Sequence, residues 1–287
     1  FSIVTPTYNR CELLKRAIDS VVNQTLQNWE LLIIDNHSID GTKELVKTYE
    51  NEKIKYLQIK NSGIIAKSRN LGIENSEGEF IAFLDSDDWW YSNKLEIISR
   101  YIKDYDFIYH DMDVFINEKK SKDKLRVRDL KSPIFDDLMI NANAIINSSV
   151  VFRSSLIDEV GFIDESNDLS SIEDYDFWIQ ISRKTNLFKL IPDSLGGYQK
   201  HASNESKFSD SSINKIDYLF EKNSKYLDKT NKITAFFTKE YLKGRVYYEL
   251  EIFENALLCF KRSMKSKIME FKFKSFIMIL MSCSKLL

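Results

Sequence analysis

The chain has 287 residues, a formal net charge of −2 and three cysteines, with 43% hydrophobic and 29% charged residues. This ordinary globular balance excludes a disordered, collagen-like or disulfide-stapled protein, and the charge excludes a nucleic-acid binder that works by bulk positive charge. The sequence contains no run of about 18 apolar residues, the length that a helix needs to span a bilayer. Because no secretory signal opens the sequence either, we expect a cytosolic protein.

The first half of the sequence alternates short apolar runs with helical patterns. Apolar runs predict strands at residues 2–4, 30–34, 54–57 and 79–84. Apolar residues at helical spacing predict helices over residues 13–22, 42–49 and 64–75. Strand–helix–strand alternation of this kind predicts an α/β fold, with a mostly parallel sheet that carries helices on both faces.

The middle of the sequence is less regular, and the last third is helical. Residues 106–115 and 148–152 predict two further strands, and residues 173–184 predict a helix. From about residue 211 onward there is no proline, one glycine and long helical periodicity. We therefore predict two domains, an α/β domain over residues 1–210 and a helical region over residues 211–287.

Polar residues follow three of the predicted strands, at the edge where an open parallel sheet binds its ligands. These segments are residues 5–10 (TPTYNR), 35–42 (DNHSIDGT) and 85–90 (DSDDWW). Asp85, Asp87 and Asp88 place three acids within four residues, and they repel one another unless a cation lies between them. Such oxygen-rich sites suit Mg²⁺ or Mn²⁺, which in turn bind phosphate. The structural alternative is a solvated turn that caps a helix.

The order of six segments resembles glycosyltransferase family 2, inverting nucleotide-sugar transferases of the GT-A fold. The matching segments are SIVTPTYNR, QNWELLIIDNHSIDGT, NSGIIAKSRNLGIENSEGEFIAFLDSDDWW, INSSVVFRSSLIDEVGFIDES, SIEDYDFW and YQKHASNES, which together cover residues 1 to about 206. No glycine belongs to a G-x-G-x-x-G motif or a P-loop, so a nucleotide would be held through metal and side chains. The resemblance implies a GT-A domain followed by a C-terminal helical extension.

The resemblance also implies a donor site. Thr5, Pro6 and Tyr8 would line the nucleobase pocket, with Tyr8 stacked on the ring. Asp35 would accept a hydrogen bond from the base imide, which favours a UDP-sugar. Arg69 would approach the ribose or the diphosphate. The structural alternatives are that Tyr8 is an ordinary loop aromatic, Asp35 a turn former and Arg69 a surface residue of a helix.

Metal and catalytic residues follow from the same resemblance. Asp87 would coordinate a Mn²⁺ or Mg²⁺ ion that bridges the diphosphate, with His201 as a further ligand. Asp85 would contact the ribose or the metal, and Ser86 belongs with the donor-binding residues. Asp174 would be the general base. The alternatives are a structural or acceptor-side role for His201, and a helix-start role for Asp174 with Glu173 or Asp176 in its place.

The implied function is that of a metal-dependent, inverting hexosyl-type transferase. It would move a sugar from a nucleoside-diphosphate sugar to a hydroxyl of a saccharide or lipid-linked saccharide, in the synthesis of a bacterial surface polysaccharide such as O-antigen or capsule. The alternatives are a sugar nucleotidyltransferase and a noncatalytic subunit of a polysaccharide-assembly complex. No nucleic-acid partner is expected.

The C-terminal segment allows two interpretations. Six basic residues and one acid are interleaved with apolar residues over 261–274, and an apolar run over 276–281 follows. The segment would either lie on an anionic membrane surface, at the inner face of the plasma membrane, or pack against the preceding helices.

Overall fold

The computed structural model describes residues 1–116, 118–125, 127–200 and 208–286. The strands of this part of the chain are β1 (Ser2–Thr7), β2 (Glu30–Asp35), β3 (Ile54–Gln58), β4 (Phe80–Phe83), β5 (Trp89–Trp90), β6 (Phe107–Ile116), β7 (Lys119–Leu125), β8 (Val151–Arg153) and β9 (Phe188–Lys200). The helices are α1 (Cys11–Val22), α2 (Thr42–Lys47), α3 (Ile65–Glu74), α4 (Lys94–Ser99), α5 (Ile134–Asn141), the 3₁₀ turn η1 (Asn147–Ser149), α6 (Leu156–Val160), α7 (Glu173–Ser182), α8 (Asp210–Ser224), α9 (Lys229–Glu249), α10 (Phe253–Ser263) and α11 (Met269–Leu286).

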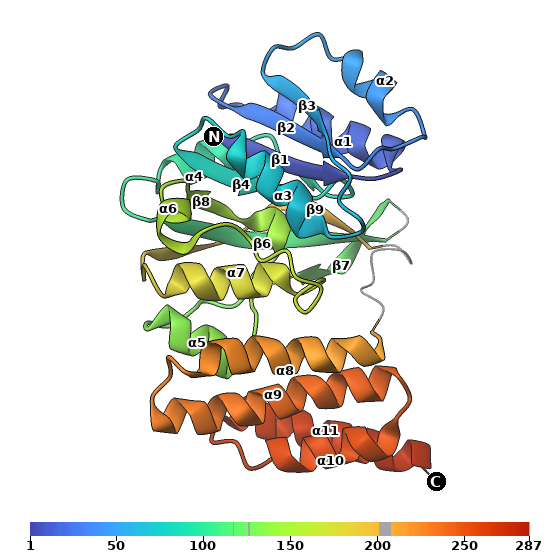
Figure 1. The fold of residues 1–287 in the computed structure, drawn as a ribbon, viewed down its shortest axis with the longest axis vertical. Coiled ribbons are helices and arrows are strands. Elements are labelled where there is room, and N and C mark those ends of the chain that lie inside the picture. Colours follow the sequence, from blue (N-terminus) through green and yellow to red (C-terminus); the bar gives the residue numbers. More distant parts are fainter. Residues whose placement is uncertain (117, 126, 201–207, 287) are drawn as a thin grey trace. The chain divides into compact units, whose positions relative to one another are not determined.

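The described chain divides into two compact units, an α/β unit that contains the whole sheet and a helical unit (Figure 1). The helical unit holds α8 to α11 and takes in two earlier segments, residues 131–143 and 167–172. The predicted division into independent domains at about residue 210 stays a prediction.

The strands form one sheet with the order β3-β2-β1-β4-β8-β6-β9-β5, and β7 pairs with β6. The four strands from β3 to β4 are parallel, as the alternating sequence pattern predicts. Beyond β4 the sheet is mixed, because β8 runs antiparallel to both β4 and β6 while β6 and β9 are parallel. The predicted α/β fold class is confirmed, and its parallel part is the half that carries the predicted donor site.

Helices cover both faces of the parallel half. Ile3 and Val4 are adjacent in β1 and therefore point to opposite faces. Ile3 belongs to a core cluster that includes Leu14 and Ile18 of α1. On the other face α3 approaches β1 so closely that a Cβ atom at Gly72 would collide with the Val4 side chain. Helix α3 therefore depends on a glycine for its distance from the sheet.

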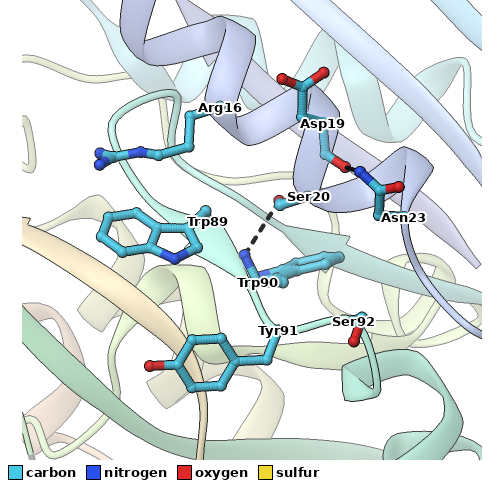
Figure 2. A pocket seen from close by; sticks show the side chains of 8 residues that line it. All are labelled: Arg16, Asp19, Ser20, Asn23, Trp89, Trp90, Tyr91 and Ser92. Carbon is cyan, nitrogen blue, oxygen red and sulfur yellow. Dashed lines mark hydrogen bonds between the residues drawn. The ribbon is translucent and has the colours of Figure 1, made fainter.

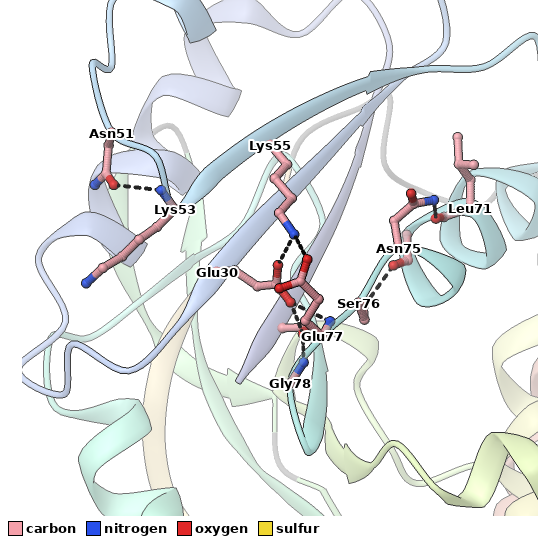
Figure 3. A network of polar contacts seen from close by, with 11 residues as sticks. Glu30, Asn51, Lys53, Lys55, Leu71, Asn75, Ser76, Glu77 and Gly78 are labelled. Atoms are coloured by element: carbon pink, nitrogen blue, oxygen red, sulfur yellow. Dashed lines mark hydrogen bonds and ion pairs between the residues drawn. The ribbon is translucent and has the colours of Figure 1, made fainter.

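The edge of the sheet where the parallel strands begin is closed by a polar network (Figure 3). Lys55 Nζ lies 2.8 Å from Glu30 Oε2 and 2.6 Å from Glu77 Oε1. Glu30 Oε1 also accepts hydrogen bonds from the Ser2 hydroxyl and from the backbone N–H of Glu77. The Ser2 hydroxyl in turn accepts the N–H of Gly78, 2.8 Å away. These contacts join the starts of β1, β2 and β3 and leave the opposite, carboxyl edge for ligands.

Two parts of the second half differ from the sequence prediction. The strand predicted over 148–152 is wrong at its start, where η1 precedes the short strand β8. The lysine-rich sequence 119–125 forms β7, which the sequence pattern does not predict. Lysines are common on edge strands, where their charge discourages pairing with another chain, so polar residues here do not signal a loop.

The helical unit has its own core. Helix α9 packs against α5, α8 and α10, and α10 also packs against α11. The core of this unit is formed by Tyr241, Ala256, Phe260 and Phe271. Across the described residues, none of the helices is long and apolar enough to cross a bilayer.

Candidate active site

The carboxyl ends of β1, β2 and β4 bring three predicted site segments to one edge of the sheet. Thr7, at the end of β1, is paired with Asp35, at the end of β2. The N–H of Leu84 donates to the carbonyl of Val4 over 3.1 Å, which places the start of the acidic loop beside β1. We use the name acidic loop for residues 85–88.

The loop after β1 is held to the loop after β2. Asn9 has a φ of 49°, in the left-handed region that residues other than glycine rarely adopt. Its N–H donates to Ser38 Oγ over 2.8 Å, and its side-chain oxygen accepts the N–H of Ile39 over 2.9 Å. The preceding Tyr8 side chain is 55% exposed at this edge, so its ring is open to a stacking partner.

The predicted base-binding residues are mostly buried. Thr5 and Pro6 lie within β1, and the buried hydroxyls of Thr5 and Thr7 have no hydrogen-bond partner within the part of the chain that the structure describes. The Asp35 carboxylate accepts hydrogen bonds from the N–H and hydroxyl of Ser38. It also accepts the Tyr56 hydroxyl, 2.5 Å away. A base imide would therefore share an Asp35 oxygen that already accepts bonds from the protein.

The acidic loop is held from one side by η1. The N–H of Asp85 donates to Ser148 Oγ over 3.0 Å, and the Asn147 amide donates to Asp85 Oδ1 over 3.0 Å. The Ser148 hydroxyl also hydrogen-bonds the carboxylate of Asp88. Burial and the charges of Asp87 and Asp85 raise the pKa of Asp88. Ser86 is buried between these acids.

A buried lysine lies beneath this contact. Lys94, at the start of α4, is fully buried, and its ammonium donates to the Ser148 carbonyl over 3.1 Å. The Trp90 indole N–H donates to the same carbonyl over 2.8 Å, and the Lys94 ammonium lies 3.5 Å from the centre of a Trp90 ring. Burial lowers the pKa of Lys94, and Asp88 opposes this shift. Ser148 thus connects the buried Lys94 side chain to the acidic loop.

Arg16 of α1 lies beside Trp89 (Figure 2) and supports the acidic loop. Its guanidinium donates to the backbone carbonyl of Asp87 over 3.0 Å and to the Gln199 side chain over 3.2 Å. It also lies 3.7 Å from the centre of a Trp89 ring. Arg16 and Trp89 line one end of a shallow pocket of about 540 Å³ that continues past Ser20 and Tyr91.

The predicted donor residue Arg69 bridges the acidic loop to the start of α7, next to the predicted base Asp174. Arg69 Nη2 lies 3.0 Å from Asp85 Oδ1, and Nη1 lies 2.8 Å from Glu173 Oε1. Asp174 follows Glu173 at the start of α7, and its carboxylate accepts the N–H of Tyr175. Burial, and next the charge of Glu173, raise the pKa of Asp174 to about 7. An acid with that pKa is poised to take or release a proton near neutral pH.

The carboxylates of the acidic loop suit a divalent cation whose remaining coordination positions are filled by a bound ligand. Carboxylate oxygens are the donors that Mg²⁺ and Mn²⁺ prefer, and the raised pKa of Asp88 reports the negative charge gathered here. No group of three or more Asp, Glu, His or Cys side chains in the described residues forms a complete metal site. Mg²⁺ usually takes only one or two carboxylates together with phosphate and water, so the carboxylates of Asp85 and Asp87 are compatible with a cation of this kind.

The structure thus brings together all of the predicted site residues except one. His201 lies outside the described residues. Sequence reasoning missed Arg10, Arg16, Lys94 and the Asn147–Ser148 pair. No sequence signal marked Lys94, a lysine at the start of α4 whose burial only the structure shows.

Comparison with known proteins assigns the family. The profile described as "Glycosyl transferase family 2" matches residues 2–161, more than half of the chain. The chain belongs to this family. The match covers the ends of β1, β2 and β4 and stops before α7, where the predicted base lies.

Two curated relatives are informative. The chain is 30% identical over 273 residues to the minor teichoic acid biosynthesis protein GgaA of Bacillus subtilis. This match covers 88% of this chain and 59% of GgaA. It is 40% identical over 118 residues to WfgD of Escherichia coli, named as a UDP-Glc:α-D-GlcNAc-diphosphoundecaprenol β-1,3-glucosyltransferase. That match covers 40% of this chain and 47% of WfgD. The chain thus spans about half the length of these relatives.

Solved structures share the fold. Staphylococcus aureus TarS in complex with UDP-GlcNAc matches with a TM-score of 0.64 at 18% identity, over 92% of this chain and 88% of that one. The mannosyltransferase PcManGT of Pyrobaculum calidifontis, in complex with GDP-Man and Mn²⁺, matches with a TM-score of 0.61 at 13% identity, over 99% and 84%. These likenesses confirm the predicted GT-A architecture.

Proposed function

We propose that the chain transfers a sugar from a nucleoside-diphosphate sugar, a UDP-sugar, to a hydroxyl of a saccharide or lipid-linked saccharide, in the synthesis of a bacterial surface polysaccharide. The observation that carries the proposal is the Arg69 bridge, which connects the acidic loop through Asp85 to the first turn of α7, where Asp174 has a pKa of about 7. The names of GgaA and WfgD support the polysaccharide setting. TarS in complex with UDP-GlcNAc supports the donor class.

The chemistry is a single displacement. The acceptor hydroxyl attacks the anomeric carbon from the face opposite the diphosphate, and the bond between that carbon and the diphosphate oxygen breaks as the new bond forms. Asp174 takes the hydroxyl proton, for which its carboxylate must be ionised. One displacement inverts the anomeric centre, so an α-linked donor yields a β-linked product and a free nucleoside diphosphate.

Asp87 and Asp85 would hold the divalent cation, Mn²⁺ or Mg²⁺, with His201 as a further ligand. When bound, the cation supplies a Lewis acid that neutralises the leaving diphosphate. PcManGT in complex with Mn²⁺ supports this assignment. Asn147 and Arg69, which both contact Asp85 Oδ1, orient the carboxylate for this role.

Tyr8, Thr5, Pro6 and Asp35 would bind the uracil base. The exposed Tyr8 ring can stack on the base, and the unpartnered Thr5 hydroxyl in β1 is a polar group that a bound nucleoside could satisfy. Asp35 is held by the Ser38 turn, so its position is fixed before the base arrives. Such preorganisation reduces the ordering cost of binding.

The site of action would be an anionic membrane surface, reached through α11. This helix has one face packed in the core of the helical unit and another that exposes large apolar side chains. A lipid-linked acceptor would make that location useful, because enzyme and acceptor would then meet in the plane of the membrane.

The decisive experiment is a screen of nucleotide sugars for metal-dependent hydrolysis and for transfer to a lipid-linked saccharide. We expect one UDP-sugar to be consumed in the presence of Mn²⁺ or Mg²⁺, with release of UDP. Thermal unfolding with UDP, GDP and CDP provides the matching binding assay, in which UDP should protect most. Equal protection by UDP and GDP would contradict the uracil assignment, and release of pyrophosphate from a sugar phosphate and UTP would indicate a nucleotidyltransferase instead.

A further inference from the structure

Arg10 contacts the carboxylate that is assigned to the metal. Its Nη1 atom lies 2.5 Å from Asp87 Oδ2. The Arg10 side chain is 32% exposed, whereas that of Asp87 is 8% exposed. A cation of the protein therefore neutralises Asp87. A divalent cation would have to share this carboxylate or displace the guanidinium.

The backbone around Arg10 is fixed on both sides. The preceding Asn9 is bonded to Ser38 and Ile39, and the N–H of the following Cys11 donates to Asp40 Oδ2 over 2.8 Å. Because the loop after β2 holds both neighbours, a change of partner by the guanidinium needs only rotation of the Arg10 side chain. The partly exposed side chain has the freedom for such a rotation.

We propose that Arg10 exchanges partners, so that its guanidinium pairs with Asp87 in the donor-free protein and with the diphosphate of the bound nucleotide. This inference rests on the proposed function and adds a residue to it. A guanidinium offers paired N–H groups in a plane, a geometry that matches phosphate oxygens as well as carboxylate oxygens. If the acidic loop binds the diphosphate through a cation, the diphosphate lies beside Asp87. That position is within reach of the Arg10 side chain.

The exchange predicts coupling between nucleotide and metal. When Arg10 turns to the diphosphate, it no longer competes with Mn²⁺ or Mg²⁺ for the Asp87 carboxylate. Binding of the metal likewise releases Arg10 for the diphosphate. By thermodynamic linkage, each ligand must raise the affinity for the other by the same factor. The donor-free protein would thus hold the metal weakly, and the donor complex would hold it firmly.

The test compares the wild-type protein with Arg10→Gln in three titrations: Mn²⁺ alone, UDP with Mn²⁺, and uridine with Mn²⁺. We expect Arg10→Gln to weaken UDP binding about 10- to 100-fold, the range for a lost charge-assisted hydrogen bond. Uridine binding should be unchanged, because uridine has no diphosphate. Binding of Mn²⁺ alone should become stronger, because the residue at position 10 no longer brings a cation to Asp87. Arg10→Lys, which keeps the charge but loses the planar fork, should give intermediate UDP affinity.

The matched control is Arg183→Gln. Arg183 is exposed, directly follows α7 and donates to the Gln180 side chain, so all three affinities should stay at the wild-type values. Equal losses for UDP and uridine would show that Arg10 only shapes the loop. Unchanged UDP affinity, or weaker binding of Mn²⁺ alone, would also overturn the exchange. A wild-type protein that binds no nucleoside diphosphate would contradict the proposed function, and the titration with Mn²⁺ alone would still decide the competition at Asp87.

Discussion

Arg69 donates a hydrogen bond to Glu173 over 2.8 Å, between residues 104 positions apart in the sequence. Both side chains are buried, and each brings a charge that the other neutralises. A buried ion pair contributes little to stability on balance, but removal of one partner is costly. The pair therefore serves best as a fixed connection, which holds the start of α7, and with it Asp174, near Asp85.

The first prediction concerns the pH dependence of turnover. Burial and Glu173 raise the pKa of Asp174 to about 7, and a general base acts in its ionised form. We expect kcat to rise with pH through about 7. Asp174→Asn should lower kcat by about 10²–10⁴-fold and abolish this inflection. Calorimetry should show unchanged UDP binding, and a loss of UDP binding would instead place Asp174 in the donor site.

The second prediction concerns stability and follows from the same shift. The pKa of Asp174 is higher in the folded state than in the unfolded chain, so its contribution to stability is full below about pH 4 and is lost as pH rises through about 7. Asp174→Asn removes the buried charge. The variant should therefore exceed the wild type in Tm by more at pH 8 than at pH 5. Asp158→Asn, at an exposed position in α6, should give no such pH-dependent difference.

The third prediction concerns the metal. Asp87→Ala removes a carboxylate at the end of an apolar strand, where we propose that the cation binds. We expect transfer to stop, and Mn²⁺ binding in the presence of UDP to weaken strongly. Asp104→Ala, at an exposed position before β6, should leave both unchanged. Full turnover of the wild-type protein in excess chelator would contradict the proposed metal dependence.

The fourth prediction treats Ser148 as a positioning residue for the acidic loop. Ser148→Ala removes the acceptor for the Asp85 N–H and the hydrogen bond to Asp88, at a cost of about 1–3 kcal/mol of stability for groups left buried and unpaired. UDP affinity in the presence of Mn²⁺ should fall as well. Ser182→Ala is the matched control, because this buried hydroxyl donates to the Ile179 carbonyl of its own helix.

The Ser182→Ala control separates an effect on the position of the acidic loop from an effect on the stability of the fold. Both serine variants should lower Tm, but only Ser148→Ala should weaken UDP binding with Mn²⁺ relative to UDP binding in a chelator. If the two variants lose UDP affinity in proportion to their loss of Tm, the contact of Ser148 with the acidic loop has no specific role.

The sequence predicts best those features for which the pattern of a strand and the chemistry of the loop after it point to the same place. The apolar run before Asp85 and the acids after it indicate both a strand and a site, and β4 and the acidic loop lie where expected. The supporting residues are different, because their roles depend on contacts between distant segments. Ser148 acts through Asp85, 63 positions away, and Lys94 is a common helix residue whose burial no periodic pattern reveals.

The last prediction concerns α11, for which the sequence left packing and membrane contact open. The helix has a packed face, since Phe271 belongs to the core of the helical unit. Packing does not account for Phe273 and Leu280, whose side chains are 65% and 56% exposed. The two are seven residues apart and therefore share one face of the helix.

We expect the protein to cosediment with anionic vesicles at low salt, to lose this binding at high salt, and to bind neutral vesicles weakly, because lysines beside the apolar face attract anionic headgroups. The double variant Phe273→Ser/Leu280→Ser should abolish cosedimentation without lowering Tm, since exposed side chains contribute little to the folded core. Ile233→Ser is the control, because Ile233 of α9 is also 53% exposed but lies on another helix. An absence of binding to anionic vesicles at low salt would contradict the membrane role. A large loss of Tm in the double variant would show instead that this face of α11 is packed in solution.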